Sequence, residues 1–458
     1  MARSGFPTAS DLLATLKISL RLSIGYLGGI AIGATDNIML GHLGHDALGA
    51  AGLASSIYNP IVMMGIGMTF PVMVFISQAR GAGRSRTAPR IIRQGLWISG
   101  MLSVPSLAVL WNLESILLLT GQDPTLARMA DHYMDYYMWT IFPIFTSYMF
   151  IYAFTGMDRT TTIILILWSE VGLNAVLNYV LIFGKFGFPA MGMAGAGLAS
   201  IIVYAAGHTA FFSILAFHRF FRNVVVFRRV WRPKWTMLGQ FLRLGWPKSF
   251  ELLLKSSLYA VMALLAGRFD VEALASHTIA HQISMIFTVT VSIAVANAVA
   301  TRTGVAKGQG SLDGIWGILN GGLLLILLFI LPLIAVLKIF SPWVVMLFVG
   351  SGLDARALLP IASPLVVLVA FFVLMDGLRM VVGQALNGLS DIKTPTLIAA
   401  ISYWGIALPV GVVLGFVMEL GVLGLWWGLI FGMAVAAVAC LARFRWVIRH
   451  FSSVAKGG

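Results

Sequence analysis

The chain has 458 residues, of which 59% are hydrophobic and only 10% are charged, and its formal net charge is +14. A water-soluble protein of this length could not keep so much apolar surface out of water, so the composition excludes a soluble globular domain. We therefore expect an integral membrane protein.

Apolar stretches that are long enough to cross a bilayer recur along the whole chain. A transmembrane helix needs about 20 mainly apolar residues. Stretches of this kind lie at 14–38, 51–76, 91–113, 131–156, 160–184, 190–217, 243–266, 275–300, 315–338, 360–388, 396–417 and 421–446. Their hydrophobicity is continuous rather than alternating, which argues against a membrane barrel. The sequence predicts an all-α integral membrane fold of about twelve transmembrane helices.

The basic residues are concentrated in alternate loops. If the N-terminus is cytoplasmic, the cytoplasmic segments hold Arg80, Arg84, Arg86, Arg90, Arg93, Arg159, the cluster 219–248, Arg302, Lys307, Lys393 and the tail from Arg443. The opposite loops hold only Arg128, Lys185, Arg268, Lys338 and Arg356. This asymmetry follows the positive-inside rule and predicts a multi-pass plasma-membrane protein with both termini in the cytoplasm. It also explains the net charge without a nucleic-acid partner, for which the sequence offers no basic-aromatic groove.

An internal repeat divides the chain near its middle. The segment MLGHLGHDALGAAGLASSI (39–57) resembles LAGRFDVEALASHTIAHQI (265–283). We expect an N-terminal six-helix lobe at 1–218, a basic cytoplasmic linker at 219–240 and a C-terminal six-helix lobe at 241–458. An even number of spans in each half keeps both copies in one orientation, so we expect a pseudo-two-fold axis along the membrane normal.

Asp36, near the end of the first predicted span, is the first candidate functional residue. A charge inside a span costs roughly 3 kcal/mol or more, and such residues commonly mark ion or substrate pathways. A carboxylate at this depth could bind Na⁺ through its oxygens or take up a proton. The alternative is an interface residue close to the lipid headgroups, because GHLGHD (41–46) follows at once.

Glu170, Asn174 and Asn178 are spaced four residues apart in the fifth predicted span, so they share one helix face. Polar side chains on one stripe in hydrocarbon must face the interior of the bundle. Their amide and carboxylate oxygens could complete a hard-cation site with Asp36, and Glu170 could also line a substrate cavity. The alternative is that these side chains form interhelical hydrogen bonds that hold the spans together.

Glu251 and Asp376 are acidic residues in the seventh and tenth predicted spans. Either one could handle a coupling ion, including Na⁺. The alternative is internal pairing, because Lys248 and Lys255 flank Glu251 at helical spacing and Arg379 follows Asp376 by three residues. An ion pair would explain how each charge is tolerated in the membrane without any turnover.

Aromatic side chains supply candidates for a substrate cavity. Tyr58, Tyr148 and Phe287 could surround a lipophilic cation through cation–π contacts. The alternative is that they pack in the interior or belong to the aromatic belts at the membrane surface.

Six further segments stand out as motifs: DNIMLGHLGHDALGAAGLA (36–54), QARGAG (78–83), GLNAVLNYVLIFG (172–184), WPKSFELLL (246–254), ALASHTIAHQI (273–283) and MDGLRMVVGQALNGLSDIKTP (375–395). Together they resemble the multidrug and toxic compound extrusion (MATE) family, and most of all its bacterial NorM branch. The resemblance covers nearly the whole chain. It implies a twelve-helix, two-lobed secondary transporter that expels organic cations in exchange for Na⁺ or H⁺.

The resemblance also implies roles for five residues. Asp36 matches the acidic residue of the N-terminal lobe, and Asn174 and Asn178 match its polar partners. Glu251 and Asp376 match the acidic pair of the C-terminal lobe.

The expected function is multidrug efflux by antiport and alternating access, without enzymatic activity, because the sequence contains no nucleotide-binding motif and no catalytic constellation. We expect no cofactor, a coupling ion that is either Na⁺ or H⁺, cationic amphiphilic drugs or dyes as cargo, and a monomer in contact with membrane lipids. The alternative is a lipid-linked saccharide flippase, which should line its cavity with several basic residues to hold pyrophosphate. The intramembrane charges are instead mostly acidic, with Lys255 and Arg379 as the exceptions.

Overall fold

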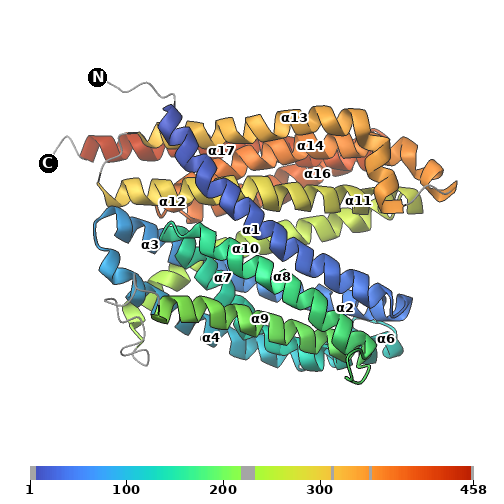
Figure 1. Cartoon of the computed structure of the whole chain (residues 1–458). Coiled ribbons are helices and arrows are strands. Elements are labelled where there is room, and N and C mark those ends of the chain that lie inside the picture. Colours follow the sequence, from blue (N-terminus) through green and yellow to red (C-terminus); the bar gives the residue numbers. More distant parts are fainter. Residues whose placement is uncertain (1–6, 218–232, 311–313, 350–352, 455–458) are drawn as a thin grey trace. The chain divides into compact units, whose positions relative to one another are not determined.

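The computed structural model describes residues 7–217, 233–310, 314–349 and 353–454, and this part of the chain is helical, with no strand (Figure 1). The α-helices are α1 Ala9–Gly41, α2 His45–Thr69, α3 Pro71–Gly81, α4 Ala88–Leu110, α5 Leu113–Leu119, α6 Pro124–Tyr137, α7 Ile141–Gly156, α8 Thr160–Phe183, α9 Gly192–Phe217, α10 Trp235–Ala266, α11 Val271–Phe287, α12 Ala294–Gly308, α13 Ile315–Val349, α14 Leu353–Gly388, α15 Lys393–Ala400, α16 Leu408–Val412 and α17 Gly421–Val454.

The spans agree with the predicted fold class. Within the described residues, eleven helices are long and apolar enough to cross a membrane, and the count is twelve if a bent pair is one span. The bent pair joins Ser85–Leu110 to Leu113–Leu119 at an angle of 55°. It corresponds to the predicted stretch 91–113, whose end the apolar pattern placed at the bend. The prediction of about twelve membrane helices is therefore confirmed.

Chain contacts define two compact units. One contains Ile24–Ser249, here called the N-terminal unit, and the other combines Met1–Ser23 with Phe250–Gly458, here called the C-terminal unit. Both divisions fall inside a continuous helix, in α1 and in α10. Of the predicted linker 219–240, residues 219–232 lie outside the described residues, and α10 begins in the remainder. The predicted lobe boundaries and symmetry axis remain predictions.

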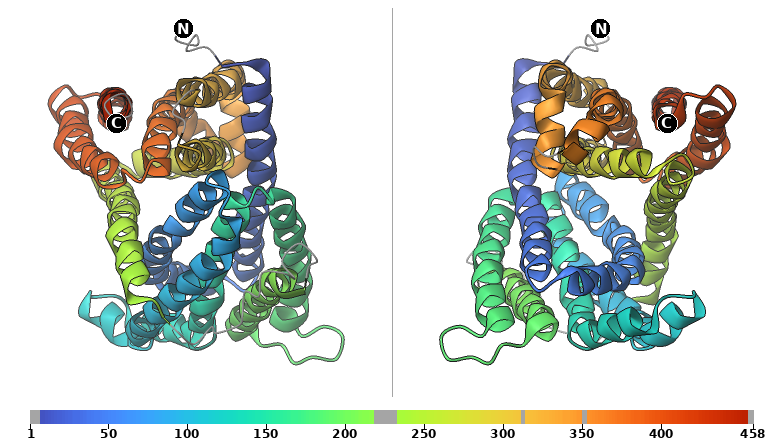
Figure 2. Two further views of the ribbon diagram at one scale, coloured as in Figure 1. Left: turned by 90° about the vertical axis from the view of Figure 1, so that its left-hand side faces the viewer. Right: turned by 90° about the vertical axis from the view of Figure 1, so that its right-hand side faces the viewer.

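In the N-terminal unit, α8 and α9 are adjacent in sequence and pack against each other (Figures 1 and 2). Small residues permit the close approach, because a Cβ atom added at Gly195 would lie 2.6 Å from the Leu181 carbonyl oxygen. Glycine at such positions allows helix backbones to meet in a membrane, where lipid offers no hydrophobic driving force for association.

In the C-terminal unit, α14 is the central helix and packs against α11, α12, α13 and α17. A second contact in this unit depends on glycines spaced four apart on α17, at Gly424, Gly428 and Gly432. A Cβ atom on Gly428 would overlap the backbone of Gly411, which lies on α16. This is the small-residue packing that brings membrane helices into backbone contact.

Candidate cation site

Asp36 on α1 meets Asn174 and Asn178 on α8 inside the N-terminal unit. Asn178 Nδ2 donates to Asp36 Oδ1 over 2.6 Å, and Asn174 Nδ2 donates to the same oxygen over 2.9 Å. The Asp36 side chain is 9% exposed, and both asparagines are fully buried. The structure therefore brings together the three residues that the sequence placed in one site.

The residues next to this carboxylate carry side-chain oxygens that have no hydrogen-bond partner among the described residues. Asn174 Oδ1 and Asn178 Oδ1 are buried and accept no hydrogen bond from the described residues. Ser200 on α9 also faces Asp36, although its Oγ makes no hydrogen bond of standard geometry there. Hard cations such as Na⁺ bind carboxylate, amide and hydroxyl oxygens. The donor set fits Na⁺ if each amide turns its oxygen inward, and it fits a proton on Asp36 without any such turn.

A cluster of tyrosines lies near the same carboxylate. The rings of Tyr58 and Tyr137 are 4.6 Å apart, and those of Tyr133 and Tyr137 are stacked at 4.9 Å. Tyr133 and Tyr137 both interact electrostatically with Asp36. Sequence analysis selected Tyr58 but missed the other two, although their four-residue spacing on α6 indicates a shared helix face. Aromatic faces beside a buried acid can bind an organic cation.

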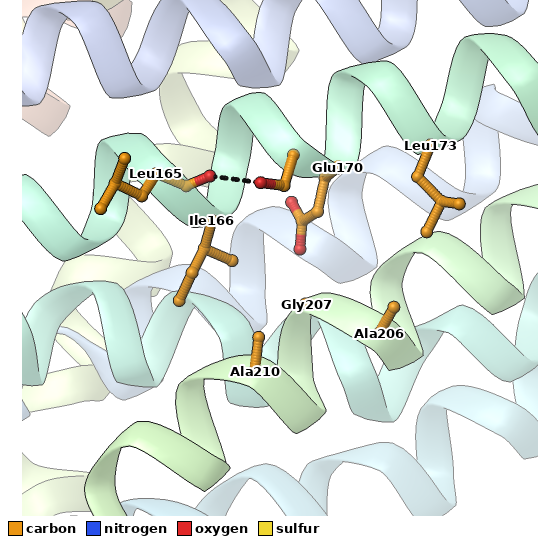
Figure 3. Close-up of a pocket in the computed structure, with 8 residues that line it drawn as sticks. Leu165, Ile166, Glu170, Leu173, Ala206, Gly207 and Ala210 are labelled. Atoms are coloured by element: carbon orange, nitrogen blue, oxygen red, sulfur yellow. Dashed lines mark hydrogen bonds between the residues drawn. The ribbon is translucent and has the colours of Figure 1, made fainter. Parts of the chain in front are cut away.

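Glu170 lies on α8 one turn before Asn174 but does not join the Asp36 group. Its carboxylate points to α9 at Gly207, and its Oε1 atom is buried without a hydrogen-bond partner among the described residues. Figure 3 shows this carboxylate against the α9 backbone, at the wall of a pocket between the two helices. Tyr148, predicted to line a cavity, is half-buried on α7 and interacts electrostatically with Glu170.

In the C-terminal unit, Glu251 and Asp376 are joined by two basic side chains. Arg379 donates from Nη1 to Glu251 Oε1 over 3.1 Å and from Nε to Asp376 Oδ1 over 3.0 Å. Lys255 Nζ donates to Asp376 Oδ2 over 2.6 Å. We call these four residues the charge quartet. The two negative charges of its acids equal the two positive charges of its bases. Asp376 is fully buried.

The quartet differs in detail from the pairing that the sequence suggested. Lys255 contacts Asp376 on α14 rather than Glu251, which lies one turn away on its own helix. Arg379 bridges both acids and also lies 5.4 Å from the centre of the Tyr403 ring. Phe287 is half-buried and packs against the hydrophobic core of its unit. Within the described residues, no group of three or more His, Cys, Asp or Glu side chains could hold a metal ion.

Comparisons with known proteins agree with this architecture. The MatE family model matches residues 23–180 and 247–413. The chain is 33% identical over 438 residues to a probable multidrug resistance protein NorM of Mesorhizobium japonicum, covering 95% of this chain and 93% of that protein. It is 32% identical over 453 residues to a protein of the same description from Bradyrhizobium diazoefficiens, covering 98% and 97%.

Solved structures share the fold. A crystal structure of MATE in the bent conformation superposes with a TM-score of 0.87 at 20% identity, over the full length of both chains. An outward-facing multidrug resistance MATE transporter superposes with a TM-score of 0.86 at 21% identity, over 96% of each chain. The chain therefore belongs to the MATE family, in its NorM branch, and it is a transporter rather than an enzyme.

Proposed function

We propose that this protein is a secondary active multidrug efflux antiporter that exports organic cations in exchange for Na⁺ or H⁺ by alternating access. One observation carries the proposal: the buried carboxylate of Asp36 contacts only uncharged side chains among the described residues, namely Asn174, Asn178 and Ser200. An anion without a countercharge in a membrane span is costly and attracts a positive species. The relatives described as multidrug resistance proteins support organic drugs as the cargo.

Competition for one negative charge couples the two flows. While Asp36 holds Na⁺ or a proton, an organic cation gains little by binding there, so each ligand lowers the affinity for the other. The membrane potential supplies about 2.3 kcal/mol per charge for every 100 mV. The nearby tyrosines Tyr58, Tyr133 and Tyr137 would contact the apolar part of the cargo.

Glu251 and Asp376 enter this proposal differently. Each already pairs with Arg379, and Asp376 also pairs with Lys255. A cation that bound either acid would have to compete with these bases. We infer that the quartet responds to cargo or coupling ion by exchanging partners, whereas Asp36 binds one directly.

The flippase alternative receives less support. It requires basic side chains that are available to pyrophosphate, but Lys255 and Arg379 are both engaged with carboxylates.

The remaining elements of the proposal are a bacterial inner membrane location, cytoplasmic termini and a monomeric transporter.

The test is efflux of ethidium, a cationic dye, from reconstituted vesicles under separately imposed Na⁺ and pH gradients. We expect at least one gradient to drive efflux, and we expect Asp36→Asn to abolish it. Asp46→Asn is the matched control, because it removes an exposed carboxylate at the start of α2 and should transport normally. Efflux that depends on neither gradient, or that persists in Asp36→Asn, would contradict the proposal.

A further inference from the structure

A pocket of about 250 Å³ lies between α8 and α9 of the N-terminal unit (Figure 3). Its walls are apolar except for Ser169 and Glu170, and Ser169 Oγ donates to the Leu165 carbonyl of its own helix. The other lining residues are Ile166, Leu173, Ala206, Gly207 and Ala210. Leu165 is 66% exposed, so one side of the pocket is continuous with the apolar surface of the span.

The Glu170 carboxylate occupies space that Gly207 leaves open. The side chain is 4% exposed, and its Oε1 atom has no hydrogen-bond partner among the described residues. A Cβ atom added at Gly207 would overlap Oε1. An acid is therefore accommodated between these helices by the absence of a side chain opposite it, rather than by a hydrogen-bond donor.

The groups packed around Glu170 leave its charge uncompensated. Tyr148 on α7 interacts electrostatically with it but carries no positive charge. On α9, His208 follows Gly207, but its Nδ1 atom lies 2.6 Å from Thr146 Oγ1 and its ring packs against Phe150. No lysine or arginine of the described chain forms an ion pair with Glu170 or lines its pocket. An isolated carboxylate in hydrocarbon is costly, so a positive ligand would stabilise it.

The depth of the pocket restricts the kind of ligand. Glu170 lies ten residues after the start of α8 and thirteen before its end. At 1.5 Å per residue these separations correspond to about 15 and about 20 Å, which puts the acid in the middle of the span. The amine of a lipid headgroup would not reach this depth. Drug-sized ligands occupy pockets of about 300 Å³ or more, so a bulky polycyclic cation would not fit either.

We propose that this pocket is a second cation site of the N-terminal unit, distinct from the Asp36 group, which binds the ammonium head of a linear amphiphilic monocation that enters from the lipid phase. The head contacts the Glu170 carboxylate, and the alkyl chain lies along the apolar surface beside Leu165 and Leu173. The inference goes beyond the antiport proposal because it concerns equilibrium binding, which requires no gradient and no turnover.

Carboxyl labelling tests the site one residue at a time. The full-length protein in lipid nanodiscs is treated with dicyclohexylcarbodiimide, a lipid-soluble reagent that forms a stable adduct with carboxyl groups in apolar surroundings, and the adduct at Glu170 is quantified by peptide mass spectrometry. Octyltrimethylammonium is the probe. Its uncharged control is 2,2-dimethyldecane, in which carbon replaces the nitrogen. At a probe concentration of about ten times its Kd, labelling at Glu170 should be about tenfold slower.

Variants separate this site from the Asp36 group. Protection of Glu170 should persist in Asp36→Asn and in Ser257→Ala, which removes an exposed hydroxyl bonded to its own helix, α10, outside the pocket. It should be lost in Gly207→Ala, where the new methyl group displaces the carboxylate. Glu170→Gln has no carboxyl group at this position, so it defines the background of the labelling measurement.

Three results would each overturn the proposal. The first is no adduct at Glu170, which would mean that lipid-soluble molecules do not reach it. The second is equal protection by the uncharged analogue, which would mean that the pocket binds alkyl chains without using the charge. The third is loss of protection in Asp36→Asn, which would place the ammonium at the Asp36 group instead.

Discussion

Asn178 on α8 donates a 2.6 Å hydrogen bond to Asp36 on α1, although the two residues are 142 positions apart in the chain. Asn174 donates to the same oxygen atom. Each hydrogen bond to a charged group contributes about 1.5–3 kcal/mol to stability. Burying the carboxylate costs roughly 3 kcal/mol or more. The two effects are comparable in size, so the amides can hold the acid in the membrane without cancelling its charge.

The first prediction concerns the charge of Asp36. In Asp36→Asn we expect ethidium efflux to fall to the level of empty vesicles, because the negative charge that binds either cation is gone. The melting temperature in detergent should change by only a few degrees, since the lost hydrogen bonds and the lost desolvation cost offset each other. Efflux and thermal unfolding are measured on the same preparation. A large fall in melting temperature together with lost efflux would indicate a structural role for the carboxylate.

The second prediction concerns the charge quartet. Arg379→Met should destabilise the protein by about 3–5 kcal/mol, because it removes the base that pairs with both Glu251 and Asp376. Thermal unfolding in detergent measures the loss. Adding Glu251→Gln to Arg379→Met should recover part of the lost stability, since the quartet then keeps one negative charge, on Asp376, and one positive charge, on Lys255.

Arg128→Met is the matched control for the quartet, because Arg128 is exposed and, among the described residues, its side chain donates to the Pro124 carbonyl of its own helix. It should leave the melting temperature unchanged. If Arg379→Met proved as harmless as this control, the quartet would contribute no net stability.

The third prediction concerns helix contact between α16 and α17. Gly428→Val should destabilise the protein by at least about 1–3 kcal/mol, because its side chain would overlap the Gly411 backbone. Gly405→Val is the control, since Gly405 is exposed and a Cβ atom there would meet, within the described chain, only Ile401 of the preceding turn. Equal melting temperatures for the two variants would show that this backbone contact is not tight. The measurement is thermal unfolding in detergent.

The fourth prediction concerns the first part of α1. Arg302 on α12 donates to the Asp11 carbonyl and to Thr15 Oγ1, both at 2.6 Å, and pairs with the Asp11 carboxylate. Arg302→Gln should weaken this attachment by about 1 kcal/mol, because the groups are partly exposed. Amide hydrogen exchange of residues 9–23 should then be about fivefold faster. Arg268→Gln, which changes an exposed loop residue, should leave it unaltered.

The fold could be predicted because the physics of a bilayer is simple. Any segment that crosses must satisfy its own backbone and expose apolar side chains, so length and hydropathy identify the spans. The 55° bend between Leu110 and Leu113 could not be predicted in the same way, because hydropathy indicates where an apolar stretch ends but not the angle at which the chain continues. The Asp36 group was predicted from the resemblance and from the spacing of Asn174 and Asn178.

Helix geometry explains why Glu170 did not join that group. At 3.6 residues per turn, each four-residue step rotates a side chain by about 40° beyond a full turn. Glu170 and Asn178 therefore diverge by about 80° on α8. This rotation is enough for one to face α9 while the other faces α1. Four-residue spacing indicates a shared stripe but does not establish that every member has the same neighbour.

Lys255 shows a second limit to predicting contacts from sequence spacing. An ion pair between residues one turn apart on a helix contributes only about 0.2–0.5 kcal/mol. A buried carboxylate from another helix gains far more from the same lysine, because the interior screens the charges less. Sequence spacing reveals the local candidate, Glu251, whereas the actual partner, Asp376, depends on how α10 and α14 pack.

Between α11 and α12 the chain forms a π-helical turn at Thr288–Ile293. Such a turn takes up one extra residue, so the side chains that follow are rotated by about 100° from the positions that an uninterrupted α-helix would give them. Ser292 thereby lies so close to Gly377, the residue after Asp376, that a Cβ atom there would be 2.9 Å from its hydroxyl. In the span from Val271 to Gly308, the side chains before and after this turn therefore point in directions that one regular helix of the same sequence could not combine.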